Sequence, residues 1–171
     1  MLPREFYEQK TLHVAKALLG KFLVHGGIAG MITETEAYIG QHDLACHASK
    51  GRTKRTEIMF GSAGHAYIYL IYGMYYCLNV VTERENYPAA VLIRAVEGIT
   101  GPGRLTRHFK IDKTLNGENM TKSKRLWIED RGVEALPRHI LRTPRIGVDY
   151  AGEWKDKKWR FLILPPNPLL P

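Results

Sequence analysis

The amino-acid sequence predicts an α+β fold: a single domain over residues 1–171 with a curved, largely antiparallel β-sheet and flanking helices. Several segments are rich in β-branched and aromatic residues, whereas few show the spacing of a helix. A chain of 171 residues, of which 44% are hydrophobic, can bury a core without disulfide bridges. No internal repeat, low-complexity tract or linker divides it.

The N-terminal part is expected to hold one helix and two strands. Thr11 is predicted to cap the helix and Gly20 to end it. The apolar residues of one helical face are Leu12, Ala15, Leu18 and Leu19. Residues 22–24 then form a short strand, and a turn at 26–27 leads into a second strand at 31–39.

The middle of the chain predicts a β-hairpin. Residues 65–82 are dense in aromatic and β-branched types and are interrupted by Gly73, which disfavours a helix. We place the turn near Tyr72 and Gly73. The apolar run at 89–95 then predicts a central strand.

The C-terminal part carries weaker signals. Gly101-Pro102-Gly103 predicts the start of a short basic helix at 104–110. Late strands are expected at 147–150 and 159–164, and a proline-rich tail from Pro165.

The charge of the chain favours a polyanionic partner. It has 25 Lys and Arg residues against 17 Asp and Glu, a formal net charge of +8. Such a surplus suits nucleic acid or an anionic membrane surface. However, residues 1–10 lack the apolar core of a signal peptide, and no apolar run is long enough to span a membrane. Because Cys46 and Cys77 make no disulfide framework, we expect an intracellular protein that is not secreted, in the cytoplasm (nucleoid) or nucleus.

The strand at 31–39 places two acids and a tyrosine together. Side chains alternate along a strand, so Glu34, Glu36 and Tyr38 share one face. This face is a candidate pocket wall. The alternative is a solvated edge strand that displays two acids.

Residues 42–55 are expected to form a basic loop. Its cations Lys50, Arg52, Lys54 and Arg55 are candidate contacts to DNA phosphates, which would make binding depend on salt. His42, Cys46 and His47 are types that bind metals, but their spacing matches no structural zinc pattern. We therefore predict no metal, with His47 turned inward. The alternative is a flexible basic surface loop.

The tip of the predicted hairpin presents an aromatic side chain. Tyr72 precedes Gly73, and a large ring at such a tip has little core to bury into. Proteins that kink duplexes insert wedges of this kind between base steps. Ordinary sheet packing is the alternative, and we accept it for Tyr67, Tyr75 and Tyr76.

Three further arginines are candidates for contacts to the DNA backbone. Arg104 follows a glycine-proline-glycine segment that resembles a phosphate-binding helix start, a common feature and a weak signal. Arg142 and Arg145 add positive charge near the C-terminus. The alternative for these two is simple solubilising charge.

Together these segments resemble the alkyladenine (3-methyladenine) DNA glycosylases. The most specific blocks are ETEAY at 34–38 and YLIYGMYYCLN at 69–79. The second block lies within a matching segment at 67–81, and the other matching segments are 43–47, 52–55, 59–61, 90–97, 101–105, 142–152 and 159–161.

The resemblance implies a hairpin that enters the minor groove, with Tyr72 as its intercalating residue. It implies that Glu36 is the general base and that Asn79 crowds out purines with a 2-amino group. Arg94 matches a supporting polar residue. The pocket for the base is implied to consist of Tyr38, His47, Tyr69, Asn79 and Arg94.

The function implied is that of a DNA-3-methyladenine glycosylase acting on double-stranded DNA with damaged purines. The substrates would be 3-methyladenine, 7-methylguanine, hypoxanthine and ethenoadenine. A flipped base would leave by hydrolysis of its N-glycosidic bond, giving an abasic site for base excision repair. We expect a monofunctional, monomeric enzyme without cofactor or metal. The alternatives are a non-catalytic binder of damaged or kinked DNA and an RNA-binding or RNA-modifying module.

The sequence departs from the family pattern in two places. Only residues 98–100 separate Glu97 from Gly101, where the family often has a longer basic segment, and the turn at 26–27 is short. These departures concern the surface that contacts DNA and leave the residues of the chemistry in place.

Overall fold

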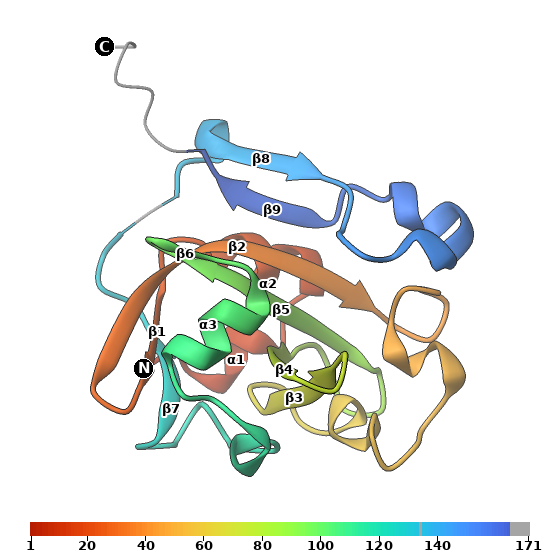
Figure 1. Ribbon diagram of the computed structural model, residues 1–171, viewed down its shortest axis with the longest axis horizontal. Helices are drawn as coiled ribbons and strands as arrows, with labels where there is room; N and C mark the ends of the chain where they lie inside the picture. Colours follow the sequence, from red (N-terminus) through yellow and green to blue (C-terminus); the bar gives the residue numbers. More distant parts are fainter. Residues whose placement is uncertain (134, 165–171) are drawn as a thin grey trace.

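The computed structural model describes residues 1–133 and 135–164, and there the predicted α+β architecture is confirmed (Figure 1). Within those residues nine strands form a sheet whose pairings are all antiparallel. The predicted tail from Pro165 lies outside the described residues. The strands are β1 (Phe22–His25), β2 (Ile28–Ile39), β3 (Ala66–Ile71), β4 (Tyr75–Val81), β5 (Ala89–Val96), β6 (Ile99–Thr100), β7 (Leu126–Glu129), β8 (Ile140–Thr143) and β9 (Arg160–Ile163).

Short helices complete the described part of the chain. The α-helices are α1 (Arg4–Tyr7), α2 (Thr11–Ala17) and α3 (Pro102–His108). The 3-10 helices are η1 (His47–Lys50), η2 (Glu57–Phe60), η3 (Lys113–Leu115), η4 (Pro137–His139) and η5 (Asp149–Asp156). None of the helices within residues 1–133 and 135–164 is long and apolar enough to cross a membrane.

The long strand β2 organises the sheet. It pairs with β5 along one side, and on the other side with β1 and then with β9, to which β8 adds. The pairing of β2 with β5 shifts register between Ile32 and Thr35. A bulge of this kind bends a strand and increases its twist. The curvature expected for the sheet therefore begins just before Glu36.

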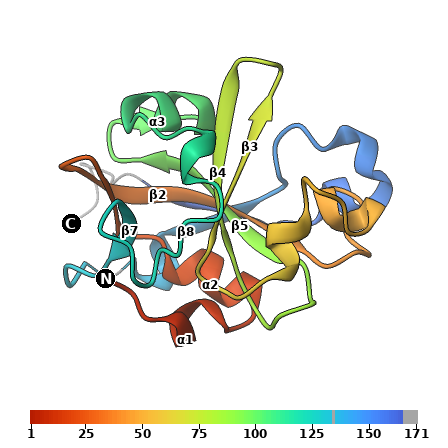
Figure 2. The same cartoon turned by 90° about the horizontal axis from the view of Figure 1, so that it is seen from below.

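The two faces of β2 have different neighbours. Thr35 donates a hydrogen bond from Oγ1 to the carbonyl oxygen of Ala15 in α2, at 2.8 Å. Helices α1 and α2 cover this face, whereas α3 and the β3–β4 hairpin lie on the other (Figure 2). Because side chains alternate, Glu34 and Glu36 face away from α2, which confirms that they share a side.

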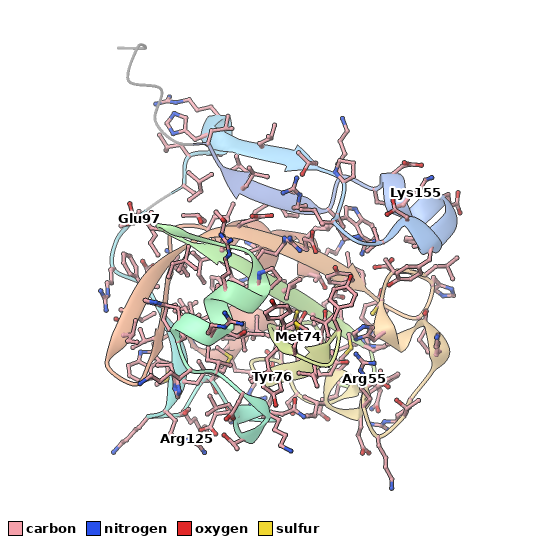
Figure 3. The ribbon with its side chains drawn as sticks, in the orientation of Figure 1. Arg55, Met74, Tyr76, Glu97, Arg125 and Lys155 are labelled. Carbon is pink, nitrogen blue, oxygen red and sulfur yellow. The ribbon has the colours of Figure 1, made fainter. Side chains whose placement is uncertain are left out.

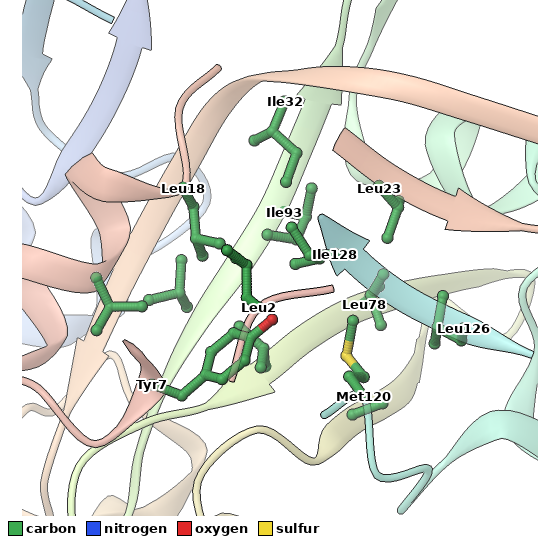
Figure 4. Packing of buried hydrophobic residues seen from close by; sticks show 14 of the residues in the cluster. Leu2, Tyr7, Leu18, Leu23, Ile32, Leu78, Ile93, Met120, Leu126 and Ile128 are labelled. Carbon is green, nitrogen blue, oxygen red and sulfur yellow. The ribbon is translucent and has the colours of Figure 1, made fainter. Parts of the chain in front are cut away.

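The main core lies between α1, α2 and the sheet. Figure 4 shows Leu18, the residue after α2, in one cluster with Ile93 of β5, with Ile128 of β7 beside Ile93 and Leu126 farther along β7. Removing such apolar surface from water contributes roughly 25 cal/mol per Å². This burial anchors β2, which carries Glu34, Glu36 and Tyr38, and β5, which carries Arg94.

Three sequence predictions need correction. Thr11 does not cap α2: it is the first helical residue, and its backbone N–H donates to Oε1 of Glu83 at 3.0 Å. Glu83, distant in sequence, therefore supplies the partner. The strand expected at 147–150 is wrong, because η5 begins at Asp149. The prediction lacks β7 and β8, which are held by their pairing with β1 and β9.

Both departures from the family pattern are true short turns. Val96 pairs with Ile99, so two residues link β5 to β6. His25 pairs with Ile28 in the same way, and both glycines between them have positive φ, +58° and +80°. Positive φ at both central residues is the signature of a type I′ hairpin turn.

Candidate active site

A cleft of about 600 Å³ opens on the face of the sheet opposite α2. Its walls come from the β3–β4 hairpin, the start of α3, the loop that leads into η1, and the segment between β8 and η5. Figure 2 shows the hairpin standing out from the body, with α3 on one side and these loops on the other. The side chains that line the cleft include Tyr38, His47, Tyr67, Tyr69, Tyr72, Tyr75, Cys77, Asn79, Leu92, Arg94, Arg104, Arg107, Ile146 and Tyr150.

Glu36 lies directly behind this wall. Its side chain is 0% exposed. The hydroxyl of Tyr38 donates to Oε2 at 2.8 Å, and the backbone N–H of Ile146 donates to Oε1 at 2.9 Å. Nη1 of Arg94 lies 3.4 Å from Oε1. All three partners belong to residues that line the cleft, whereas Glu36 itself is not among the lining residues.

A second carboxylate holds Arg94 in place. Glu34 Oε1 accepts hydrogen bonds from Nε of Arg94 at 2.9 Å and from Nη1 of Arg160 at 2.8 Å. Glu34 comes from β2, Arg94 from β5 and Arg160 from β9. Charge-assisted bonds of this type are roughly twice as strong as neutral ones. The solvated edge strand considered as an alternative is therefore wrong, because both acids are engaged in the interior.

The surroundings of Glu36 raise its pKa above the usual value of 4.5. Burial is the main cause, because removing a charge from water favours the neutral acid. Arg94, the Ile146 N–H and the Tyr38 hydroxyl oppose this shift by stabilising the anion. The result is a carboxylate that is more basic than a solvated one and has a cation beside it.

Aromatic side chains surround the cleft next to Glu36. The rings of His47 and Tyr69 pack edge to face with centroids 4.4 Å apart, and His47 Nδ1 forms a 2.9 Å hydrogen bond with the Tyr67 hydroxyl. Burial lowers the pKa of His47 to about 4, helped by Arg55 and Lys50. The imidazole is consequently neutral at neutral pH. His47 thus points inward, as predicted.

Asn79 lies in the floor of the cleft, opposite Leu92 of β5. It is buried, and its Nδ2 donates to the carbonyl oxygen of Tyr67 at 3.1 Å. This bond fixes the orientation of the amide. Any flat ligand that enters between the aromatic walls therefore meets a rigid polar group at their base.

The hairpin tip projects beyond the cleft. Tyr72 is 82% exposed and Met74 65% exposed. Figure 3 labels Met74 at this tip and Arg55 on the neighbouring loop. Tyr72 of the tip also lines the cleft, together with the cations Arg104 and Arg107.

The basic residues predicted to contact DNA divide into two groups. Six are exposed, namely Lys50, Arg52, Lys54, Arg55, Arg104 and Arg142. Of these, Arg104 alone lines the cleft. Arg52 stacks over Phe60 and Arg55 over Tyr69, with Cζ 5.1 and 5.2 Å from the ring centroids. These contacts hold part of the loop in a defined place, which argues against a wholly flexible one.

The structure corrects the prediction that Arg145 contacts the DNA backbone. Its side chain is 0% exposed, and its guanidinium forms a two-pronged ion pair with Asp43, also 0% exposed. It also donates to the carbonyl oxygens of Ala37 and Trp154 and lies over the ring of Tyr38. A group enclosed in this way cannot reach a phosphate on the surface. Arg145 instead ties the loop that carries His47 to the C-terminal segment.

Sequence reasoning missed several participants. Ile146 acts through its backbone N–H, which no residue type reveals. The role of Arg160 depends on the pairing of β9 with β2, where Arg160 lies opposite Glu36. Tyr75, assigned to sheet packing, also lines the cleft together with Arg107. Asp43 and Arg145 carry opposite charges that could have indicated an ion pair, but they lie too far apart in the sequence for the pairing to be recognised.

The described residues contain no group of three or more His, Cys, Asp or Glu side chains that could hold a metal ion. The arrangement that they do form is a buried carboxylate next to an aromatic cleft, with a projecting hairpin and basic loops at its mouth. A cleft of this kind suits a flat, aromatic and electron-poor ligand, with an acid placed to act on it. The fold and the site thus define a protein with a cleft for a flat aromatic ring beside a buried acid.

Comparisons with known proteins agree with this class. The family model of methylpurine-DNA glycosylase matches residues 5–100 and 98–166. A protein of Legionella pneumophila (strain Lens) named "Putative 3-methyladenine DNA glycosylase" is 54% identical over 173 residues, covering 95% of this chain and 93% of the relative. Relatives with the same name from Methanocella arvoryzae and Rickettsia felis are 50% and 47% identical, each covering at least 94% of this chain and 91% of the relative.

The chain belongs to the methylpurine-DNA glycosylase family. It is a DNA glycosylase, a hydrolase of N-glycosyl bonds that takes part in the repair of alkylated bases. The two family segments overlap at 98–100, the end of the short turn after β5 together with β6.

Proposed function

We propose that this protein removes alkylated and deaminated purines from double-stranded DNA and leaves an abasic site. The substrates would be 3-methyladenine, 7-methylguanine, hypoxanthine and ethenoadenine. One observation carries the proposal: the buried carboxylate of Glu36 lies immediately behind Tyr38 and Arg94, on the wall of the aromatic cleft.

The cleft supports binding of a flipped purine. A base within a duplex cannot reach Glu36, so the nucleotide must rotate out of the stack. Purines alkylated at N3 or N7 carry positive charge, which the faces of Tyr38 and Tyr69 attract by roughly 0.5–2 kcal/mol per good contact. Since His47 is neutral at pH 7, it adds no repulsion. Asn79 would limit which purines fit at the base of the cleft.

The carboxylate of Glu36 would activate the water that attacks the sugar. The water oxygen bonds to C1′ and one of its protons passes to Glu36. The bond from C1′ to the purine nitrogen breaks, and its electron pair leaves with the base. A cationic alkylpurine leaves as a neutral molecule and needs no acid. Hypoxanthine must gain a proton before it leaves, so we expect it to react more slowly.

Water would reach Glu36 through the layer that covers it. A carboxylate offers about four acceptor positions. Tyr38, Ile146 and Arg94 approach it from the cleft side and leave room for one further donor. A small movement of these three groups when the substrate enters would admit the water.

The exposed tip of the hairpin supports the insertion of Tyr72 into the duplex. Its ring would occupy the space left by the flipped nucleotide and slow the return of the base. The exposed cations Lys50, Arg52, Lys54, Arg55, Arg104 and Arg142 would contact the phosphates.

The substitution Glu36→Gln tests the proposed base. It keeps the shape of the side chain and removes its capacity to accept a proton. We expect single-turnover release of 7-methylguanine and hypoxanthine to fall at least ~100-fold, the lower end of the contribution of general bases. Binding to the same duplex should survive.

Glu97→Gln is the matched control, because Glu97 is an exposed glutamate in the turn between β5 and β6. It should release bases at the wild-type rate. Wild-type release by Glu36→Gln would refute the role of Glu36. If even the wild-type protein in excess frees no purine from any lesion duplex, the protein is instead a binder of damaged DNA.

A further inference from the structure

The β3–β4 hairpin leans on helix α3 near its tip. Tyr75 is the first residue of β4 and pairs with Ile71, directly below the turn that carries Tyr72. Figure 2 shows α3 beside this part of the hairpin. The side chain of Tyr75 lies against Gly103 in the first turn of α3.

The contact between Tyr75 and Gly103 leaves no space for a side chain. A Cβ built on Gly103 would lie 2.9 Å from both Cγ and Cδ1 of Tyr75 and 3.0 Å from its Cβ. Gly103 does not have a positive φ, so its conformation is open to other residues. The glycine is required by close packing and not by the backbone.

Two more residues of α3 complete the contact. The hydroxyl of Thr106 donates to the carbonyl oxygen of Tyr76 at 2.9 Å. The guanidinium of Arg107 lies over the ring of Tyr75, with Cζ 5.5 Å from the centroid. Tyr75 is therefore enclosed between the start and the last turn of the helix, while its neighbour is held by a hydrogen bond.

The hairpin needs such support. Strand β4 pairs with β5 only at Asn79, Val80 and Val81, so the outer half of the hairpin is a ribbon of two strands. Ribbons of this kind are marginally stable on their own. Helix α3, in turn, is anchored in the body by the buried side chain of Leu105 and by that of Phe109, which directly follows the helix.

We propose that Gly103 and Arg107 clamp Tyr75, and that this clamp sets the direction of the hairpin tip and so positions Tyr72 for insertion. The three are positioning residues, which act through Tyr72. The inference rests on the insertion of Tyr72 proposed above. It also gives Gly103 a purpose other than the phosphate-binding helix start considered from the sequence.

The experiment uses a duplex with 2-aminopurine next to hypoxanthine, mixed with excess protein under single-turnover conditions. The fluorescence rise reports unstacking when the base flips, and free hypoxanthine reports cleavage. Gly103→Ala adds a methyl group that would clash with the side chain of Tyr75. We expect it to reduce the rise and slow release by about 10- to 100-fold, since a misplacement of about 1 Å can cost this much.

Companion variants separate positioning from damage to the fold. Tyr75→Leu removes the ring and should resemble Gly103→Ala, whereas Tyr75→Phe keeps the ring and should retain more of both signals than Tyr75→Leu. Arg107→Gln changes an exposed residue and should give a smaller loss in the same direction. His108→Ala, on the exposed side of the same helix, is the control that leaves both signals unchanged. Thermal unfolding identifies any variant that fails to fold.

Tyr72→Ala distinguishes the two levels of the proposal. If it abolishes the fluorescence rise while folded Gly103→Ala and Tyr75→Leu keep it, the clamp is refuted and insertion stands. If Tyr72→Ala also keeps the rise, insertion itself is refuted, and the clamp with it. Neither result depends on Glu36, because unstacking precedes cleavage.

Discussion

Glu36 combines two opposing influences on its charge. Burial favours the neutral acid, while Arg94, the Ile146 N–H and the Tyr38 hydroxyl favour the anion. General-base catalysis is most efficient when the pKa of the base lies near the working pH. The same surroundings thus raise the basicity of Glu36 and place groups that stabilise its anion beside it.

This balance predicts the pH dependence of base release. The proposed base acts only when ionised, and its pKa is raised above 4.5. The rate for 7-methylguanine should therefore rise with pH through that raised value and level off above it. Arg94→Gln removes a group that lowers the pKa of Glu36. It should therefore move the rising part of this pH profile, its limb, to higher pH. Single-turnover rates of the wild type and of Arg94→Gln, measured between roughly pH 4.5 and 8, test both expectations.

His47 provides the control for that assignment. Its pKa of about 4 places its titration below the limb expected for Glu36. His47→Gln should change the rate but leave the position of the limb where it was. If the limb disappears in His47→Gln but remains in Glu36→Gln, its assignment to Glu36 is contradicted.

At the scale of elements, the turn of the β3–β4 hairpin holds the exposed ring of Tyr72 in a backbone conformation that lowers stability. The backbone N–H of Met74 donates to the carbonyl oxygen of Ile71 at 3.2 Å, and the two residues between them have positive φ, +53° at Tyr72 and +69° at Gly73. Type I′ turns favour asparagine at the first of these positions. A tyrosine there is strained, and such strain often accompanies function.

Tyr72→Asn should therefore stabilise the fold and impair base release. Asparagine tolerates positive φ, so we expect the free energy of unfolding to rise by about 0.5–1 kcal/mol. Release of hypoxanthine from duplex DNA should fall, because no ring is left to insert. Urea unfolding and single-turnover release measure the two effects. Tyr72→Phe, which keeps the ring, should retain activity and gain no stability.

At the scale of the whole molecule, the C-terminal segment completes the site. Strand β9 places Arg160 beside Glu34, and the loop after β8 supplies the Ile146 N–H to Glu36. Figure 1 shows this segment lying along β2. The buried pair of Arg145 and Asp43 fastens it to the loop of His47. Residues more than a hundred positions apart thus share one wall.

Two neighbouring arginines should respond differently to the same change. Arg145→Gln leaves Asp43 as an unpaired buried charge, which typically costs about 3–5 kcal/mol of stability. Arg142→Gln, on the exposed end of β8, should leave stability unchanged. If Arg142 contacts a phosphate, its loss lowers the slope of log affinity against log salt by about 0.9.

Thermal unfolding and binding titrations at several salt concentrations test this pair. Equal melting temperatures for the two variants would contradict the structural role of Arg145. An unchanged salt slope for Arg142→Gln would remove that residue from the DNA contact surface.

Local patterns in the sequence were sufficient for much of the fold. Alternation along 31–39 predicted the shared face of Glu34 and Glu36, and the aromatic segment with Gly73 predicted the hairpin. Patterns failed where partners are remote: Glu83 provides the contact at the start of α2, and four-residue strands such as β8 exist because β9 lies beside them. Charge alone could not separate buried Arg145 from exposed Arg142.

The sequence by itself determined the α+β class, the hairpin with its exposed tyrosine, and the family resemblance, because these depend on residues that are close in the chain. Only the tertiary structure decided that Glu36 is buried behind the cleft, that Arg145 is enclosed with Asp43, and that Tyr75 packs on Gly103. Burial, ion pairing and close packing are properties of neighbours in space, and the antiparallel sheet brings those neighbours together from distant parts of the chain.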